Sequence, residues 1–176
     1  MELKLERCTL RSWISKDATS LALHANNVAV WRNLRDRFPH PYTSKHAATW
    51  IRSARRATQF AIDVDGEAVG GIGYLIGEDV YRRSAEIGFW LGEPFWGRGI
   101  MSEAVRAVTQ RAFERHDICR VHAEVFDWNV ASMRVLEKVG YTREATLRRA
   151  VTKDGHTIDE MVYAILCEEE SSAGGR

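Results

Sequence analysis

The sequence EIGFWLGEPFWGRGIMS, which occupies residues 86–102, gives the strongest indication of the fold. An apolar run typical of a buried strand ends at Leu91, and an apolar pattern of helical period begins shortly after it. Gly97 and Gly99 stand between the two, with Arg98 separating them. Because glycine adopts positive φ angles and lets other groups approach the main chain closely, this segment predicts a tight strand-to-helix turn.

This turn has the properties of an anion-binding site. The first N–H groups of a helix have no partners within the helix and, with the helix dipole, attract a negative group by about 0.3–1 kcal/mol per charge. Arg98 adds a positive side chain, so a diphosphate would suit the turn. A turn that binds nothing, with Arg98 in solvent, is the alternative.

Two other phosphate-binding motifs are excluded. The chain contains no GxxxxGK[ST] sequence, so it has no P-loop. Gly71-Ile72-Gly73 lacks the third glycine of a dinucleotide fingerprint and leads into more strand.

Length and composition fit a single compact domain. The chain has 176 residues, of which 45% are hydrophobic and 28% charged, as in ordinary globular proteins. Lys and Arg number 25 against 24 Asp and Glu, so the net charge is +1, which argues against nucleic acid or an anionic membrane as partner. Two Arg clusters, Arg52 with Arg55 and Arg56, and Arg148 with Arg149, could contact anions or simply lie in solvent.

The cysteines and the N-terminus indicate a cytoplasmic protein. Cys8, Cys119 and Cys167 are widely spaced, and an odd count without a secretion signal is typical of reduced thiols. Cys119 and Cys167 stand among apolar residues, so we expect them to be buried. The N-terminus has no apolar signal core, and no run approaches the roughly 18 apolar residues of a membrane span.

Apolar periodicity predicts the order of helices and strands. We expect strands at residues 2–11, 59–64, 67–75, 84–91, 120–126, 141–150 and 157–166, and helices at residues 17–26, 44–56, 100–116 and 129–139. Thr43 is the expected N-cap of the second helix, whose inward residues would be Ala47, Ala48, Trp50 and Ile51. Asp65-Gly66 predicts a hairpin, and Gly140 a left-handed C-cap.

This order predicts an α+β fold, an α/β sandwich with a mixed central sheet of about seven strands flanked by four helices. The domain would span residues 1–167. The acidic, Ser- and Gly-rich residues 168–176 are expected to form a flexible tail.

Several motifs occur together in the order found in one enzyme family. The run Trp96-Gly97-Arg98-Gly99-Ile100-Met101 is similar to the acetyl-CoA motif Q/R-x-x-G-x-G/A of the GNAT superfamily, although Trp and Met replace the residues at its two ends. The likeness extends to residues 38–50, 127–141 and 155–159, and so to nearly the whole domain. The chain resembles the RimJ/RimL-type branch of N-acetyltransferases, which acetylates protein N-termini and small amines.

The resemblance implies a GNAT acyl-CoA N-acyltransferase fold, splayed between its fourth and fifth strands, with acetyl-CoA as co-substrate in the V-shaped gap. The residues implied to bind it, mostly through main-chain groups, are Phe89, Trp90, Leu91, Trp96, Gly97, Arg98, Gly99, Ile100, Met101, Ser102, Asn129 and Ser132. Asn129 matches the family residue that binds the pantetheine arm. Its other interpretation is a helix N-cap.

Aminolysis of a thioester requires a neutral amine and a polarised carbonyl. At pH 7 deprotonation costs about 1.4 kcal/mol for an α-amine of pKa near 8 and about 4.6 kcal/mol for a lysine, so an α-amine needs only a modest base. Glu86 is the first candidate for this base, with His122 and Glu124 as weaker alternatives; Glu86 could instead be an exposed strand residue. An N–H at a strand bulge near Leu91 would polarise the carbonyl.

The acid that protonates the leaving thiolate is not evident. Leu136 stands where many GNAT enzymes have a general-acid Tyr, so that acid is absent. By the resemblance, Ser132 could donate a hydrogen bond to the thiolate, or it could simply lie in the first turn of its helix. Transfer would be direct, without an acyl-enzyme. The six His residues show no ligand spacing, so no metal is expected.

The predicted function is transfer of an acetyl group to a primary amine, either a protein N-terminus, for example of a ribosomal protein, or a small molecule. The missing Tyr favours an alternative, a non-catalytic module that binds acyl-CoA, and the low net charge disfavours a nucleic-acid-associated protein. By family likeness, Trp31, Arg32, Arg35 and residues 38–42 would border the acceptor, although aromatic and Arg residues there could equally be core and surface residues. Exposed strand edges would be compatible with a homodimer.

Overall fold

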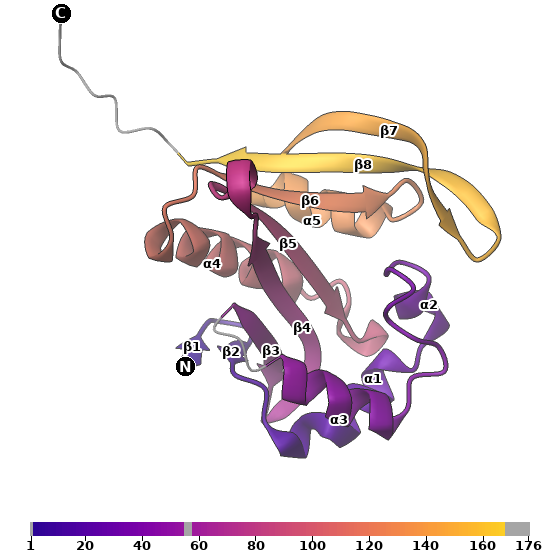
Figure 1. Cartoon of the computed structure of the whole chain (residues 1–176). Helices are drawn as coiled ribbons and strands as arrows, with labels where there is room; N and C mark the ends of the chain where they lie inside the picture. Colours follow the sequence, from indigo (N-terminus) through magenta and orange to yellow (C-terminus); the bar gives the residue numbers. More distant parts are fainter. Residues whose placement is uncertain (1, 55–57, 168–176) are drawn as a thin grey trace, which may run out of the picture.

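The computed structural model describes residues 2–54 and 58–167. The predicted tail at residues 168–176 and the predicted surface residues Arg55 and Arg56 lie outside this range. The described residues form one sheet of eight strands, in the order β1-β2-β3-β4-β5-β6-β8-β7 (Figure 1). The strands are β1 (Glu2–Lys4), β2 (Thr9–Arg11), β3 (Gln59–Val64), β4 (Glu67–Ile76), β5 (Ser84–Leu91), β6 (Arg120–Phe126), β7 (Thr142–Lys153) and β8 (His156–Leu166).

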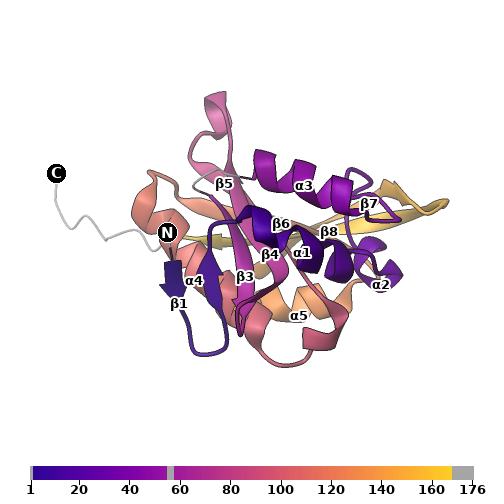
Figure 2. The same cartoon turned by 90° about the horizontal axis from the view of Figure 1, so that it is seen from below.

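Helices cover both faces of this sheet. They are α1 (Ala18–Ala25), α2 (Val28–Trp31), α3 (Ser44–Ser53), α4 (Ile100–Arg115) and α5 (Val130–Val139), with short 3-10 turns η1 (Ser15–Asp17), η2 (Asp79–Tyr81) and η3 (Glu93–Phe95). One apolar core joins the sheet to α4 and α5, and a second joins it to α1 and α3. Figure 2 shows the sheet between α3 and the pair α4 and α5. The predicted α/β sandwich is therefore confirmed.

The first predicted strand, residues 2–11, is wrong as a single element, which is why the sheet has eight strands instead of seven. A turn divides it into the antiparallel pair β1 and β2. The N–H groups of Glu6 and Arg7 in this turn donate to the two carboxylate oxygens of Glu103, at 2.8 and 3.0 Å. Because Glu103 belongs to the first turn of α4, only the tertiary structure supplies the partner that stabilises the turn.

The helix count also differs, since α2 was not predicted. Its N-cap is Asn27, whose side-chain oxygen accepts from the N–H groups of Ala29 and Val30. Thr43 caps α3 as expected, but Trp50 on that helix is 40% exposed instead of buried. Cys119 and Cys167 are exposed, contrary to expectation, because each lies at or just beyond the end of a strand.

Hairpin and cap predictions are confirmed. Asp65 and Gly66 both have positive φ, at 54° and 86°, as the two-residue hairpin between β3 and β4 requires. Gly140 ends α5 in the left-handed conformation with φ 105°. The last hairpin is longer than expected, since β7 continues to Lys153.

The sheet is splayed between β5 and β6, the fourth and fifth of the predicted strands. The parallel pairing of these two strands comprises Ser84, Ala85 and Glu86 on β5, opposite residues 120–122 on β6. Pairing of β5 with β4 continues from Ala85 to Leu91. Pairing of the two strands ends at Glu86, and Figure 1 shows them diverging toward their C-terminal ends. A strand presents every second N–H and C=O group to each neighbour, so β5 has main-chain groups facing the splay that β6 does not bind.

The tip of the last hairpin is fixed to the segment after α2. Lys153 is only 1% exposed, and its Nζ atom lies 2.7 Å from Asp36 Oδ1. The same ammonium group lies 3.9 Å from the centre of the Trp31 ring, in cation–π geometry. The ammonium group of Lys153 thus holds the C-terminal hairpin to the α2 region.

Candidate active site

The turn between β5 and α4 has the backbone geometry that the sequence predicts. Gly97 and Gly99 have φ of 75° and 78°, values that favour glycine strongly, and Gly99 is the N-cap of α4. The side chains of Ile100 and Met101 are buried in the core with α4. Their side chains therefore face away from any ligand in solvent, and these residues can offer only main-chain N–H groups at the helix N-terminus.

Two arginines flank this turn, one of which sequence reasoning missed. The guanidinium of Arg98 lies 5.2 Å from the centre of the Phe95 ring. Arg7, in the turn between β1 and β2, comes close enough that a Cβ atom added at Gly99 would lie 3.0 Å from its Nε atom. No local pattern marks Arg7, because Glu103 brings its segment to α4.

The end of β5 offers main-chain groups to the splay, while its side chains belong to the two cores. Leu91 and Phe89 pack in the core with α4 and α5, and Trp90 packs against the core with α1 and α3. The indole N–H of Trp96 donates to the carbonyl oxygen of Leu91 at 2.7 Å, which ties the strand end to the glycine turn. The bulge expected near Leu91 is wrong, because β4 and β5 pair there in regular register.

Gly88 leaves an opening in the middle of β5. It is exposed, and a Cβ atom added to it would meet no heavy atom within 4 Å. Side chains alternate along a strand, so Gly88 shares a sheet face with Glu86. Any larger residue would fill this space, which adjoins the point where β5 and β6 separate.

Helix α5 begins beside the splay, directly after β6. The side-chain oxygen of Asn129 accepts from the N–H of Ser132 at 3.2 Å, so Asn129 is the N-cap of α5. This bond leaves the amide NH₂ group of Asn129 able to donate elsewhere. Ser132 is half-buried in the first turn. Leu136, which stands at the position of the family's general-acid tyrosine, is fully buried in the core.

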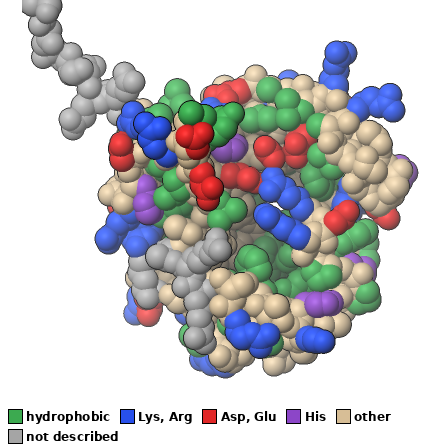
Figure 3. Space-filling model, viewed as in Figure 1, with side chains coloured by type: hydrophobic (Ala, Val, Ile, Leu, Met, Phe, Trp, Pro, Cys, Tyr) green, Lys and Arg blue, Asp and Glu red, His purple; other side chains and the backbone are tan. Residues whose placement is uncertain are grey.

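Glu86 is held in an ion pair that spans the splay. Arg35, which follows α2, places its guanidinium 2.7 Å from a carboxylate oxygen of Glu86 on β5 and 2.6 Å from one of Glu124 on β6. Burial alone would lower the pKa of Arg35, but the two carboxylates outweigh it and raise that pKa. Acidic and basic side chains lie side by side at the hollow on this face in Figure 3. Glu86 is half-buried in this cluster, with 31% of its side chain exposed.

Glu160 on β8 is a third carboxylate in this cluster and was not foreseen. It is 8% exposed and pairs in register with Phe126, the residue two positions after Glu124. Burial raises the pKa of Glu160, and so do the nearby charges of Glu124 and Glu86, while Arg35 opposes the shift. Sequence alone could not find it, since the pattern of β8 does not show what lies across the sheet.

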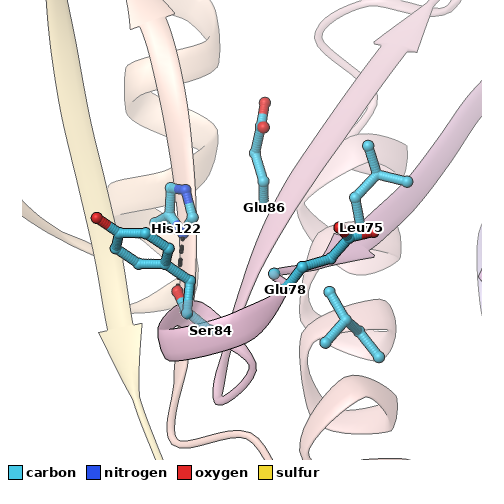
Figure 4. A pocket seen from close by; sticks show the side chains of 8 residues that line it. Leu75, Glu78, Ser84, Glu86 and His122 are labelled. Carbon is cyan, nitrogen blue, oxygen red and sulfur yellow. Dashed lines mark hydrogen bonds between the residues drawn. The ribbon is translucent and has the colours of Figure 1, made fainter.

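A cavity of about 390 Å³ adjoins Glu86 on the same face (Figure 4). Leu75 and Ile76 give it apolar sides, and Glu78 and Tyr81 belong to its lining. Ser84 and His122 also line it and are hydrogen-bonded through Oγ and Nδ1 at 3.3 Å. The volume is that of a small-molecule site.

Within the described ranges, no helix is long and apolar enough to cross a membrane. The same part of the chain contains no group of three or more His, Cys, Asp or Glu residues that could hold a metal ion.

Comparison with known proteins identifies the family. The family described as "Acetyltransferase (GNAT) domain" matches residues 7–142. The chain belongs to the GNAT acetyltransferases. The N-acetyltransferase YnaD of Bacillus subtilis (strain 168) is 32% identical over 175 residues, which cover 96% of this chain and 99% of that protein. The ribosomal-protein-serine acetyltransferase of Escherichia coli (strain K12) is 27% identical over 114 residues, covering 65% of this chain and 63% of that protein.

Solved structures confirm the GNAT fold. A GNAT-family acetyltransferase from Bacillus anthracis superposes with a TM-score of 0.83 at 24% identity, covering 94% of this chain and 98% of that one. RimL, an L7/L12 α-N-protein acetyltransferase solved with coenzyme A, also gives 0.83, at 23% identity and with the same coverage. The predicted RimJ/RimL-like GNAT resemblance is thus confirmed.

The GNAT fold brings most of the predicted site residues to the two sides of one splay. The glycine turn and the N-terminus of α5 lie at the end where β5 and β6 are apart, and Glu86 lies where they part. The expected acceptor border is also near, since Phe38 contacts Trp90 of β5 with ring centres 5.6 Å apart. Arg32 stacks over Trp128, just after β6, at 5.3 Å.

Proposed function

We propose that this protein transfers an acetyl group from acetyl-CoA directly to a primary amine. One observation carries the proposal: the splay between β5 and β6 has a glycine turn with free helical N–H groups on one side and carboxylates on the other. RimL, whose structure contains coenzyme A, and the E. coli ribosomal-protein acetyltransferase support it as relatives. The acceptor would be a protein N-terminus or a small-molecule amine.

In this proposal the cofactor is bound largely by main-chain groups. The N–H groups of residues 97–102 would bind the diphosphate, with Arg98 and Arg7 as flanking cations. Main-chain groups of Phe89, Trp90 and Leu91 that face the splay would pair with the pantetheine arm as an added strand would. The amide of Asn129 could donate to the same arm while its oxygen caps α5.

The proposed chemistry uses Glu86 and Ser132. The amine nitrogen forms a bond to the acetyl carbon, the carbon–sulfur bond breaks, and coenzyme A leaves as a thiolate. Glu86 would accept the proton that the amine loses, directly or through water. The Ser132 hydroxyl would donate a hydrogen bond to the thiolate, and main-chain N–H groups of β5 that face the splay would polarise the thioester carbonyl.

Two measurements test this function. Calorimetry should show binding of acetyl-CoA, and thiol release should follow when a panel of primary amines is added. Glu86→Gln should lower kcat by about 100-fold and Ser132→Ala by about 10-fold, with little change in acetyl-CoA affinity. Ser132→Ala keeps the main-chain N–H that Asn129 binds, so α5 should remain capped. Absence of acetyl-CoA binding would refute the proposal.

A second candidate function is a module that binds acyl-CoA without catalysis. The buried Leu136 at the position of the general-acid tyrosine favours it. Tyr141 offers no substitute, because its hydroxyl is bonded to that of Thr109 at 2.6 Å and burial raises its pKa to about 12. Acetyl-CoA binding with no thiol release on any amine would decide for this function.

Location and assembly follow as further proposals. Acetyl-CoA as donor would require a compartment that supplies it, and we infer the cytoplasm. The edges of the sheet are β1 and β7, and pairing of one such edge with a second copy would give a homodimer. Sedimentation or light scattering at several concentrations would measure this directly.

A further inference from the structure

The face of the sheet opposite α4 and α5 has an excess of negative charge where the acceptor must enter. Glu86, Glu124 and Glu160 contribute three carboxylates, and Arg35 a single guanidinium, so the cluster has a formal charge of about −2 when all are ionised. Arg35 joins Glu86 to Glu124 across the point where β5 and β6 separate. The guanidinium of Arg35 therefore already neutralises part of the negative charge at this point.

Glu160 is the member of the cluster that has no partner. Within residues 2–54 and 58–167, its carboxylate takes part in no hydrogen bond or ion pair, although the residue is 8% exposed. It pairs in register with Phe126, two positions after Glu124 on β6, so the side chains of Glu160 and Glu124 lie on the same face of the sheet. Desolvation raises the pKa of Glu160, yet its carboxylate oxygens are not sealed from solvent, so a bound cation can contact them and offset the cost of desolvation. This side chain points to a ligand with positive charge.

The reacting nitrogen cannot supply this charge. It must be neutral when it attacks the thioester, so a carboxylate cannot hold it as an ammonium ion during the reaction. A charge that remains bound throughout has to belong to a second nitrogen of the acceptor. An aliphatic amine has a pKa near 10, so that second nitrogen is cationic at neutral pH.

The cavity beside Glu86, which Glu124 and Glu160 do not line, combines apolar sides with negative charge. Leu75 and Ile76 can contact methylene groups, while Glu78 and Glu86 add negative charge to its lining. Its volume of about 390 Å³ suits a small molecule. Gly88 leaves the space between this cavity and the end of the splay without a side chain.

We propose that the acceptor is an aliphatic diamine or polyamine, and that Glu124 and Glu160 bind its non-reacting cationic nitrogen. This inference rests on the proposed acetyl transfer and specifies its substrate class. Glu86 faces the nitrogen that reacts, and the bound cation takes the position beside Glu160 that is unpaired in the free protein.

The test compares two acceptors that differ in one nitrogen, 1,4-diaminobutane and butylamine, by thiol release from acetyl-CoA. The protein should use the diamine with a kcat/KM about 10- to 100-fold higher, as a charge-assisted hydrogen bond provides. Glu160→Gln should raise KM for the diamine about 10-fold, with kcat nearly unchanged and butylamine unaffected. Equal use of both amines by the unaltered protein would overturn the proposal.

Two further variants keep the test decisive. Glu124→Gln alters a more exposed member of the cluster, so it gives the same readout if Glu160→Gln does not fold. Glu114→Gln removes one negative charge on α4, where Glu114 bonds to Gln110, and should leave both amines unaffected. A loss in Glu114→Gln equal to that in Glu160→Gln would show a general charge effect and refute the specific site.

The proposed function can fail separately. If acetyl-CoA binds but no amine releases thiol, acetyl transfer is refuted, and calorimetric titration with 1,4-diaminobutane then tests the cation site alone. Weaker binding to Glu160→Gln than to the unaltered protein supports the site, and equal binding overturns it.

Discussion

The two sides of the splay are built in different ways. On the side of α4, residues 97–102 can present main-chain N–H groups, and the side chains of Ile100 and Met101 are buried. On the opposite face, the groups are side chains, Arg35, Glu124 and Glu160, which three separate segments bring together. The first side depends on backbone conformation and the second on the identity of individual residues.

This difference suggests how one fold can keep its donor and change its acceptor. A backbone site tolerates many substitutions, provided that Gly97 and Gly99 can adopt positive φ. A side-chain site changes its charge with a single substitution such as one at Glu160. We therefore expect relatives with the same turn to differ in acceptor.

The largest effect should come from filling the space between the two sides. Gly88 is in extended strand and a Cβ atom there meets nothing within 4 Å, so Gly88→Val fits the backbone. Valine also suits a strand better than glycine, so the free energy of unfolding should stay the same or rise by up to about 1 kcal/mol. Acetyl transfer should fall by about 100-fold because the reacting groups would be displaced.

Urea unfolding and thiol release measure these two effects separately. A Gly88→Val protein that folds well and retains full activity would show that donor and acceptor do not meet at this point.

A smaller effect should distinguish the glycine turn from another glycine of the same backbone conformation elsewhere in the chain. Gly97 and Gly155 both have φ of 75° and open space around an added Cβ. Alanine at either position should therefore lower the free energy of unfolding by a similar amount, about 1 kcal/mol. Only Gly97→Ala should weaken acetyl-CoA binding, by about 10-fold, since Gly155 lies in the hairpin between β7 and β8.

Calorimetric titration of each of the two variants with acetyl-CoA measures this difference. Equal acetyl-CoA affinity in Gly97→Ala and Gly155→Ala would mean that the glycine turn does not bind the cofactor.

The smallest effect concerns how stability depends on pH through Glu160. The pKa of Glu160 is raised above its ordinary 4.5, first by burial and then by Glu124, so the folded state binds more protons than the unfolded state in that range. The free energy of unfolding contributed by this group therefore falls as pH rises from about 4.5 through the raised pKa. Glu160→Gln removes this dependence.

Chemical unfolding of both proteins at pH 4 and pH 7 tests this. The free energy of unfolding of Glu160→Gln minus that of the unaltered protein should be larger at pH 7 than at pH 4. A constant difference across that range would contradict the assignment of the shift to Glu160.

Sequence reasoning predicted the fold and the glycine turn better than the carboxylate cluster around Arg35. The turn at Gly97 and Gly99, the caps at Thr43 and Gly140 and the splay follow from local pattern or from family resemblance. Each depends on residues close together in the chain, where glycine and capping residues have clear local preferences.

The rest depends on contacts between distant residues. The break in the first predicted strand requires Glu103, 97 residues away from Glu6. Arg35 lies 89 residues from Glu124, and nothing near either residue predicts the pair. Glu160 was missed for the same reason, since its burial depends on its neighbours across the sheet.

The contact between Lys153 and Asp36 has a consequence for biosynthesis. The two residues are 117 positions apart, so the segment after α2 leaves the ribosome long before its partner in the last hairpin is made. Until Lys153 emerges, Trp31 and Asp36 lack the ammonium group that fixes them. The glycine turn and α4 are translated earlier. Nascent chains halted before residue 153 should therefore acquire the turn while Trp31 and Asp36 still lack their contact with the last hairpin.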